Sequence, residues 1–256
     1  MAQTLVIQSY RAASTGWLSD CRSSVKHWAE ENQYIHRIAE DAAFFGTIPP
    51  KLRSVLLDVS TATASDAARL YWMRQIFDDS SVDRIIWVDD DVFMLGDGPS
   101  FPPDSQVVLN RELWLFTNSR GVLARRSAVS NALMCIDRHS PFLAFYIWAI
   151  ERIASGARVE KTTLGPDLLT HWAKQIPFHV IASIPTTSPK VLADVEAGHF
   201  ELLDSITFGG LTGLRGVHLC GSIVGRTVNG ITVTDQLIER ALYNLQDALR
   251  TQEGKR

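Results

Sequence analysis

The fold is decided by an apolar segment that runs into three acids, Arg84-Ile85-Ile86-Trp87-Val88-Asp89-Asp90-Asp91-Val92-Phe93-Met94-Leu95. Residues 85–88 are β-branched or aromatic, and no polar residue alternates with them, so they predict a strand buried on both faces. The acids then follow the carboxyl end of that strand, where open α/β sheets bind ligands. Because side chains alternate along a strand, we expect Asp89 and Asp91 on one side, with α-carbons about 6 to 7 Å apart, and Asp90 on the other.

The acidic triplet has two interpretations. Adjacent carboxylates repel one another, so they favour a site in which Asp89 and Asp91 share a divalent cation. Hard oxygen ligands of this kind suit Mg²⁺ or Mn²⁺. Alternatively, the three acids form a solvated turn that caps the next element. The buried strand before the triplet favours the metal site.

Composition describes an ordinary globular protein. The chain has 256 residues, of which 46% are hydrophobic and 21% charged, enough for one substantial core. A formal net charge of −3 gives no general attraction to nucleic acid. Cys21, Cys135 and Cys220 are odd in number and far apart, so we expect buried thiols in a reducing compartment. We see no signal-peptide pattern or membrane-spanning run, and expect a cytoplasmic protein for which peripheral membrane association stays open.

The first hundred residues predict alternating strands and helices. Strands are expected over 5–9, 34–38 and 85–88, with amphipathic helices over 17–32 and 65–77 between them. This order predicts an α/β fold with a mostly parallel central sheet flanked by helices.

Beyond residue 106 the pattern changes, and we place a soft boundary near Leu95. Recurrent glycines over 208–231 indicate tight turns. The expected elements are short strands over 106–109, 113–117 and 122–124 and helices over 141–155, 166–175 and 234–251.

A second informative stretch is Ala64-Ser65-Asp66-Ala67-Ala68-Arg69, at the expected start of a helix. By itself it is explained by Ser65 or Asp66 capping the helix and by an ion pair between Asp66 and Arg69 one turn on. Followed one helix later by the acid-tipped strand, however, it resembles the GT-A fold nucleotide-sugar glycosyltransferases that carry a DxD motif. The nearer relatives are the initiating α-mannosyltransferases, the clostridial glucosylating toxins and the lipooligosaccharide galactosyltransferases.

This resemblance implies a metal-dependent transferase that moves a sugar from a UDP- or GDP-sugar to a carbohydrate or other small acceptor. Asp91 would bind Mn²⁺ or Mg²⁺ directly, and Asp89 would contact the ribose or the metal. Residues 1–95 would form the nucleotide-sugar half and 96–256 the smaller acceptor half of one GT-A (Rossmann-like) domain. The donor contacts that it implies are Ser65, Asp66, Arg69, Asp89, Asp90 and Ser222.

Two later segments fit the same resemblance. Gly165-Pro166-Asp167 is similar to a glycine-proline helix opening that borders the sugar site, although it also fits a plain helix start with Asp167 at the positive dipole end. The segment 216–222 is similar to a histidine segment that supplies a further metal ligand, His218, although a lone histidine is more often structural. The family's lysine-proline-tryptophan continuation is missing, which leaves Arg226 as a phosphate-binding candidate.

The chemistry leaves alternatives open. An inverting enzyme needs a carboxylate base, for which Asp167 or Glu112 is available, whereas the nearer relatives retain the anomeric configuration. Asp91 is the other residue we expect in catalysis, through the metal. A metal-dependent phosphohydrolase would need additional acids and a lysine in the same pocket. A sugar-nucleotide-binding protein without catalysis is the third possibility.

Overall fold

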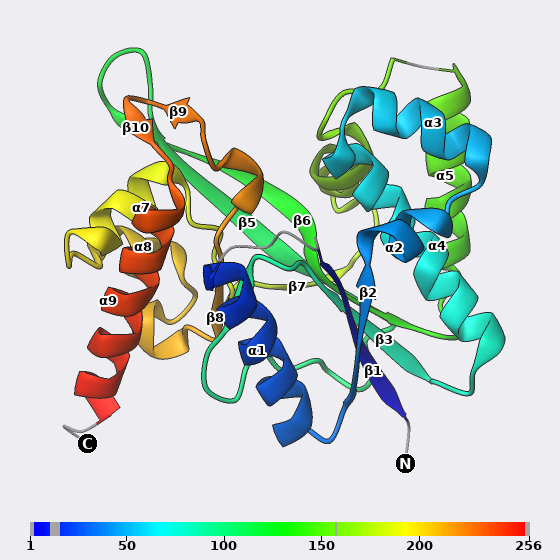
Figure 1. The fold of residues 1–256 in the computed structure, drawn as a ribbon, viewed down its shortest axis with the longest axis horizontal. Helices are drawn as coiled ribbons and strands as arrows, with labels where there is room; N and C mark the ends of the chain where they lie inside the picture. The colour runs from blue at the N-terminus through cyan, green and yellow to red at the C-terminus, as the bar shows by residue number, and fades with distance from the viewer. Residues whose placement is uncertain (1–2, 11–15, 157, 254–256) are drawn as a thin grey trace.

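The computed structural model describes residues 3–10, 16–156 and 158–253, and its centre is a six-stranded sheet in the order β2-β1-β3-β6-β5-β7 (Figure 1). Strand β1 pairs in parallel with β2 and β3, and β5 pairs in parallel with β7, whereas β6 is antiparallel to both of its neighbours. Five of the six strands therefore run in one direction, and the predicted mostly parallel α/β sheet is confirmed. The strands are β1 (Thr4–Tyr10), β2 (Ile35–Glu40), β3 (Arg84–Val88), β5 (Val107–Thr117), β6 (Leu123–Asp137) and β7 (His179–Ile181).

Strand β3 is buried on both faces, as its sequence predicts. Ile85 and Trp87 pack against one group of helices, and Ile86 and Val88 pack against α1 on the other face, all at most 1% exposed. Apolar side chains on both faces leave no position for a solvent-facing polar residue, which explains the unbroken apolar run. The helices of these two layers are α1 (Gly16–Glu31), α2 (Asp41–Gly46), α3 (Pro50–Val59), α4 (Thr61–Asp79) and α5 (Phe142–Gly156).

A third hydrophobic cluster is built around the carboxyl-terminal helix, α9 (Asp235–Glu253), whose prediction is confirmed. This cluster lies on the opposite side of the molecule from the helices α2, α3, α4 and α5. The sheet and α1 lie between the cluster and those four helices (Figure 1). Two glycines near it, Gly209 and Gly225, have φ of +80° and +81° and form the expected turns. The remaining elements are β4 (Val92–Met94), η1 (Thr163–Asp167), α6 (Leu168–Trp172), α7 (Pro189–Glu196), α8 (Glu201–Ile206), η2 (Gly210–Gly213), β8 (Gly216–His218), η3 (Gly221–Ile223), β9 (Thr227–Val228) and β10 (Ile231–Thr232).

The strands predicted over 106–109, 113–117 and 122–124 do fall on strands, but their division into three short strands is wrong. The structure has two long strands instead, β5 and β6, of 11 and 15 residues. The polar first half of β6 pairs with β5 and is partly solvent-exposed, so it lacks the apolar signal that predicts strands. The pairing shifts between Leu109 and Asn110, which leaves residues 131–133 of β6 without partners on β5.

Two predicted helix starts are also corrected. Helix α4 begins at Thr61, where Ser60 caps it by accepting a 3.0 Å hydrogen bond from the Thr63 N–H, so Ser65 lies in its second turn. The threonines and alanines of the first turn carry no apolar periodicity, which hid the true start. The helix expected over 166–175 is instead a π-helical turn, η1, followed by the short α6.

The three cysteines are buried and free, as expected. Among the described residues, we find no helix with the length and apolar character needed to cross a bilayer.

The position of the α4 cap gives a stability test. We expect Ser60→Ala to lower the free energy of unfolding by about 1 kcal/mol, because the Thr63 N–H loses its acceptor. Ser65→Ala is the matched control, since its hydroxyl lies one turn inside the helix and accepts a long contact of 3.4 Å from Arg69 Nη2, and its loss should cost about 0.5 kcal/mol or less. Urea unfolding of both variants measures the difference, and a larger loss for Ser65→Ala would contradict the assigned cap.

Candidate active site

A cleft with a volume of about 520 Å³ lies at the carboxyl ends of β1 and β3. Its lining comes from helix α4, from the acidic triplet, from the β5–β6 hairpin and from residues 218–226. Ser65, Asp66, Arg69, Asp89, Asp90, Asp91, His218 and Ser222 all line it. The chain therefore brings these eight predicted site residues to one cleft.

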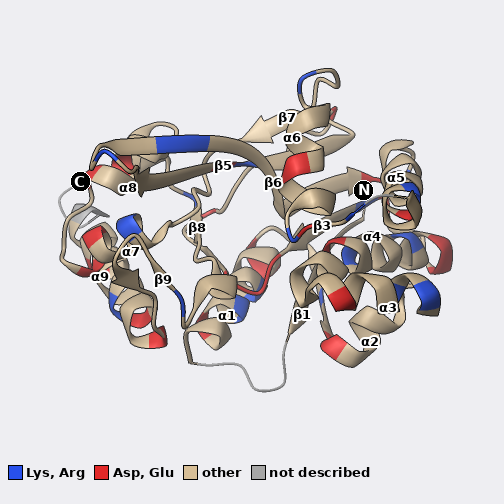
Figure 2. Ribbon diagram, turned by 90° about the horizontal axis from the view of Figure 1, so that it is seen from above, with Lys and Arg blue, Asp and Glu red and all other residues tan. Residues whose placement is uncertain are grey.

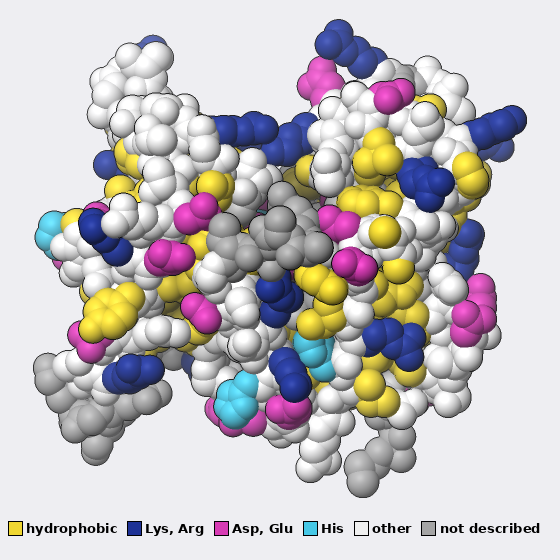
Figure 3. Space-filling model, viewed as in Figure 1, with side chains coloured by type: hydrophobic (Ala, Val, Ile, Leu, Met, Phe, Trp, Pro, Cys, Tyr) yellow, Lys and Arg dark blue, Asp and Glu magenta, His cyan; other side chains and the backbone are white. Residues whose placement is uncertain are grey.

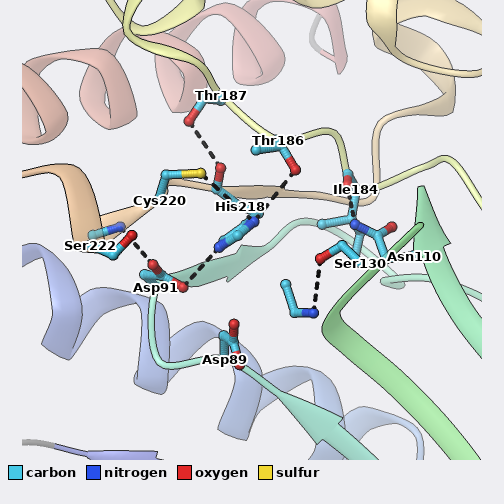
Figure 4. Close-up of polar contacts among 12 residues, drawn as sticks. Asp89, Asp91, Asn110, Ser130, Ile184, Thr186, Thr187, His218, Cys220 and Ser222 are labelled. Atoms are coloured by element: carbon cyan, nitrogen blue, oxygen red, sulfur yellow. Dashed lines mark hydrogen bonds and ion pairs between the residues drawn. The ribbon is translucent and has the colours of Figure 1, made fainter. Parts of the chain in front are cut away.

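The acidic triplet forms a turn between β3 and β4, closed by a 3.2 Å hydrogen bond from the Val92 N–H to the Asp89 carbonyl. Asp89, Asp91 and His218 each offer a ligand atom within 4.8 Å of the other two, and Figure 4 shows them facing one another. The two aspartates therefore meet, but because of the turn and not through strand alternation. Asp90 also lines the cleft, which the expected alternation had placed on the other side.

His218 reaches Asp91 because β8 pairs antiparallel with β4, in a register that places it opposite Val92. Its Nε2 lies 3.2 Å from Asp91 Oδ1, and the Gly221 N–H donates a 2.6 Å hydrogen bond to Asp91 Oδ2. Burial opposes a charge on either side chain, but the imidazole and this N–H hold the pKa of Asp91 below its usual value. Despite burial, the neighbouring Cys220 and Asp91 raise the pKa of His218 well above its usual value.

The other ring nitrogen of His218 is also held. Thr186 Oγ1 lies 3.4 Å and Cys220 Sγ 3.9 Å from Nδ1, on the side away from Asp91 (Figure 4). Groups that hold Nδ1 orient the ring and leave Nε2 directed at the aspartates, an arrangement common around metal-binding histidines.

Asp89 is fixed by α4 and by its own strand. Arg69 Nη1 lies 2.9 Å from Asp89 Oδ1, and Trp87 Nε1 donates a 2.6 Å hydrogen bond to the same oxygen. The guanidinium stacks 4.8 Å from the centre of the Trp87 ring and also lies 3.3 Å from Asp66 Oδ1. Burial raises the pKa of Asp89, and it raises the pKa of Asp66 to about 6, against the effect of Arg69.

Asn131 joins this network but was not identified from the sequence. Its side-chain amide donates a 2.9 Å hydrogen bond to Asp66 Oδ1, and its backbone carbonyl accepts a 2.6 Å hydrogen bond from Arg69 Nη1. It belongs to the segment of β6 that lacks partners on β5, a local irregularity with no sequence signal. Gly165 also touches this group, since a Cβ there would lie 2.7 Å from Asp66 Oδ2. The glycine of the Gly165-Pro166 pair is therefore needed for close approach to Asp66.

Besides Arg69 and Arg126, two more cations line the cleft with the acids, Lys161 and Arg226. Lys161 Nζ lies 3.5 Å from Ser222 Oγ, and Arg226 lines the same cleft. Burial and Arg226 lower the pKa of Lys161. Within the described part of the chain, neither cation has a carboxylate within 4.0 Å, so both are available to an anion. Lys161 was missed because an isolated lysine in a polar segment carries no signal.

The two candidate bases differ in location. Glu112 is buried in the cleft wall beside Trp114, with Arg126 Nη2 3.6 Å from its Oε1. Asp167 is exposed, accepts a 2.6 Å hydrogen bond from Thr162 Oγ1 and does not line the cleft. The structure therefore brings Glu112 to the acidic group and does not bring Asp167.

The residues present fit a divalent metal. Asp91 Oδ1 is buried and, apart from its ion pair with His218 Nε2 at 3.2 Å, has no hydrogen-bond partner among the described residues, so a cation would complete its contacts. The two carboxylates suit both Mn²⁺ and Mg²⁺, and the imidazole favours the transition metal Mn²⁺. Asp89, Asp91 and His218 would hold the ion.

No family model and no curated protein sequence matches the chain. Among solved structures, it is similar to a glycosyltransferase involved in glycosylation of the major capsid of PBCV-1, with 11% identity and a TM-score of 0.49 over 94% of this chain and 99% of that one. It is also similar to galactosyltransferase LgtC, with 12% identity and a TM-score of 0.47 over 93% of this chain and 95% of that one. Mouse xyloside xylosyltransferase 1 is similar with 11% identity and a TM-score of 0.47, over 87% of this chain and 99% of that one. Because these TM-scores lie below 0.5, we derive the function from the cleft itself.

Arg69 gives a test of the buried network. We expect Arg69→Met to lower the free energy of unfolding by about 3 to 5 kcal/mol at pH 8 without metal, because Asp66 and Asp89 lose their cation.

This loss should depend on pH. A carboxyl with a raised folded-state pKa stabilises the fold below its unfolded pKa, and that contribution disappears as pH rises through the folded pKa, about 6 for Asp66. Without Arg69 both carboxyl pKa values rise further, so the variant should lose less stability at pH 5 than at pH 8. Urea unfolding at both pH values measures this, and an equal loss at both would contradict the assigned network.

Proposed function

We propose that this protein is a metal-dependent glycosyltransferase that uses a UDP- or GDP-sugar as donor. The observation that carries the proposal is the meeting of Asp89, Asp91 and His218 within 4.8 Å, in a cleft that also holds the unpaired cations Lys161 and Arg226. A metal-diphosphate complex needs oxygen and nitrogen ligands on one side and cations for its remaining charge on the other. This cleft supplies both.

Each part of the cleft has a task in this proposal. Asp89, Asp91 and His218 hold Mn²⁺ or Mg²⁺, which when bound neutralises charge on the leaving diphosphate. Lys161 and Arg226 contact the phosphate oxygens, and Ser222 holds Lys161 in place through its 3.5 Å contact.

The donor sugar lies against the network on α4. Asp66 and Asn131 offer hydrogen-bonding groups at the cleft wall, and Arg69 keeps the Asp66 carboxylate charged and oriented. In this proposal residues 1–95 provide the two aspartate ligands and the α4 network, and residues 96–256 add Asn131, His218, the two cations that contact the diphosphate and the acceptor wall. The acceptor is a carbohydrate or other small molecule bound on the side of Glu112 and Trp114, and Asp167 takes no part in this arrangement.

Metal-dependent nucleotide binding tests the proposal directly. We expect UDP or GDP to bind at least about tenfold more tightly with Mn²⁺ than with EDTA, because the diphosphate adds ligands to the ion. Asp91→Asn should remove this difference, since it replaces a charged metal ligand by a neutral amide. Isothermal titration calorimetry measures both.

Asp78→Asn is the matched control, because Asp78 is exposed on the last turn of α4, outside the residues that line the cleft. Its nucleotide affinity should equal that of the wild type. Metal-dependent affinity that survives in Asp91→Asn would refute the metal site. Release of phosphate from simple phosphate esters, without nucleotide binding, would indicate a phosphohydrolase instead.

The stereochemical prediction follows the resemblance to retaining transferases. We expect the product to keep the anomeric configuration of the donor, and Glu112→Gln to lower kcat/KM by less than about tenfold, because no general base is then required of Glu112. Proton NMR of the product gives the configuration. An inverted product together with a loss above about a hundredfold in Glu112→Gln would assign Glu112 as the base of an inverting enzyme.

A further inference from the structure

The β5–β6 hairpin carries a concentration of positive charge. Residues 111–126 contain four arginines and one glutamate, a net charge of +3. The remaining 240 residues contain 21 basic and 27 acidic residues, a net charge of −6. Basic positions are visible along this hairpin in Figure 2, and Figure 3 shows Lys and Arg side chains along the notch between the two upper projections of the molecule. The arginines are Arg111, Arg120, Arg125 and Arg126.

Only one of these arginines lines the cleft. Arg126 pairs in register with Trp114, and both face the cleft. Arg125 is opposite Leu115, which packs into the carboxyl-terminal hydrophobic cluster, so Arg125 lies on the other face of the hairpin. The alternation of the strand therefore directs one guanidinium into the acceptor side of the cleft, beside an aromatic ring, and leaves the others to raise the local positive potential.

Arg126 makes one weak ion pair among the described residues. Its side chain is 61% exposed, and its ion pair with Glu112 is long, with 3.6 Å between Arg126 Nη2 and Glu112 Oε1, so it is weak and leaves guanidinium N–H groups for a ligand. Among the described residues, the guanidinium of Arg126 donates no hydrogen bond. A planar guanidinium with free donors binds the oxygens of a phosphate in a bidentate manner.

Resting on the proposed function, we infer that the acceptor carries a phosphate group that Arg126 recognises, with the acceptor's apolar face against Trp114. Lys161 and Arg226 serve the donor diphosphate, so Arg126 is the cation left for the acceptor. A phosphorylated sugar and the phosphate of a membrane lipid present the same chemistry. The substrate class is thus a phosphate-bearing acceptor, from either source.

The test uses the full chain with UDP or GDP and Mn²⁺ present. We expect hexose 6-phosphates to bind at least about tenfold more tightly than the matching neutral hexoses, measured by calorimetry, because they add a charge-assisted contact. In parallel, sedimentation compares vesicles of phosphatidylcholine alone with vesicles that also contain phosphatidylglycerol. Preference for the hexose phosphates identifies a soluble source, and preference for the anionic vesicles alone identifies a lipid.

The variants separate this inference from the proposed function. Arg126→Gln should abolish the preference for phosphate while nucleotide affinity with Mn²⁺ changes less than twofold. Arg125→Gln removes the same charge from the opposite face and should keep most of the preference. The inference is overturned if neither probe is preferred over its neutral counterpart, if both arginine variants lose the preference equally, or if Arg126→Gln weakens nucleotide binding to the same extent. Absence of nucleotide binding in the wild type would instead refute the proposed function.

Discussion

The structure depends on the burial of carboxylates at the end of an apolar strand. β3 is enclosed on both faces, so the acids that follow it enter a region where charge is costly unless compensated. Arg69 compensates Asp89 and Asp66 from helix α4, and His218 compensates Asp91 from β8. The acids of the cleft are therefore held from α4, on one side of the sheet, and from β8, near the carboxyl-terminal hydrophobic cluster. Among the described residues, Asp91 Oδ1 has the His218 ion pair and no further hydrogen bond, which leaves this buried oxygen able to bind a cation.

The same constraint explains the arrangement of the less regular segments. Gly165 must lack a side chain for its turn to approach Asp66, and the unpaired segment of β6 places Asn131 between Asp66 and Arg69. The short β4–β8 pair has one evident consequence, which is to bring His218 and the Gly221 N–H to Asp91. Each of these three local features thus gives a buried acid one of its contacts.

Much of this arrangement could be predicted from sequence because it depends on local patterns. The apolar run of β3, the amphipathic helices and the acids at a strand end are periodic or compositional signals. They predict the sheet correctly and place Asp89 and Asp91 together, although a turn and not the expected strand alternation brings the two side chains to one site. Contacts between residues far apart in the sequence leave no periodic or compositional signal. Asn131 and Lys161 reach the cleft through a strand irregularity and a loop, and the true cap of α4, Ser60, precedes a turn of threonines and alanines. Asp167 was selected from a local helix-start pattern, which cannot show that the side chain points to solvent.

The most direct measurement is a crystal structure of the protein soaked with MnCl₂ and UDP or GDP, with anomalous scattering recorded for manganese. We expect one strong manganese peak in contact with Asp89, Asp91 and His218, and the diphosphate between that ion and the pair Lys161 and Arg226. A manganese peak elsewhere, or a nucleotide bound outside this cleft, would contradict the proposed metal-diphosphate site.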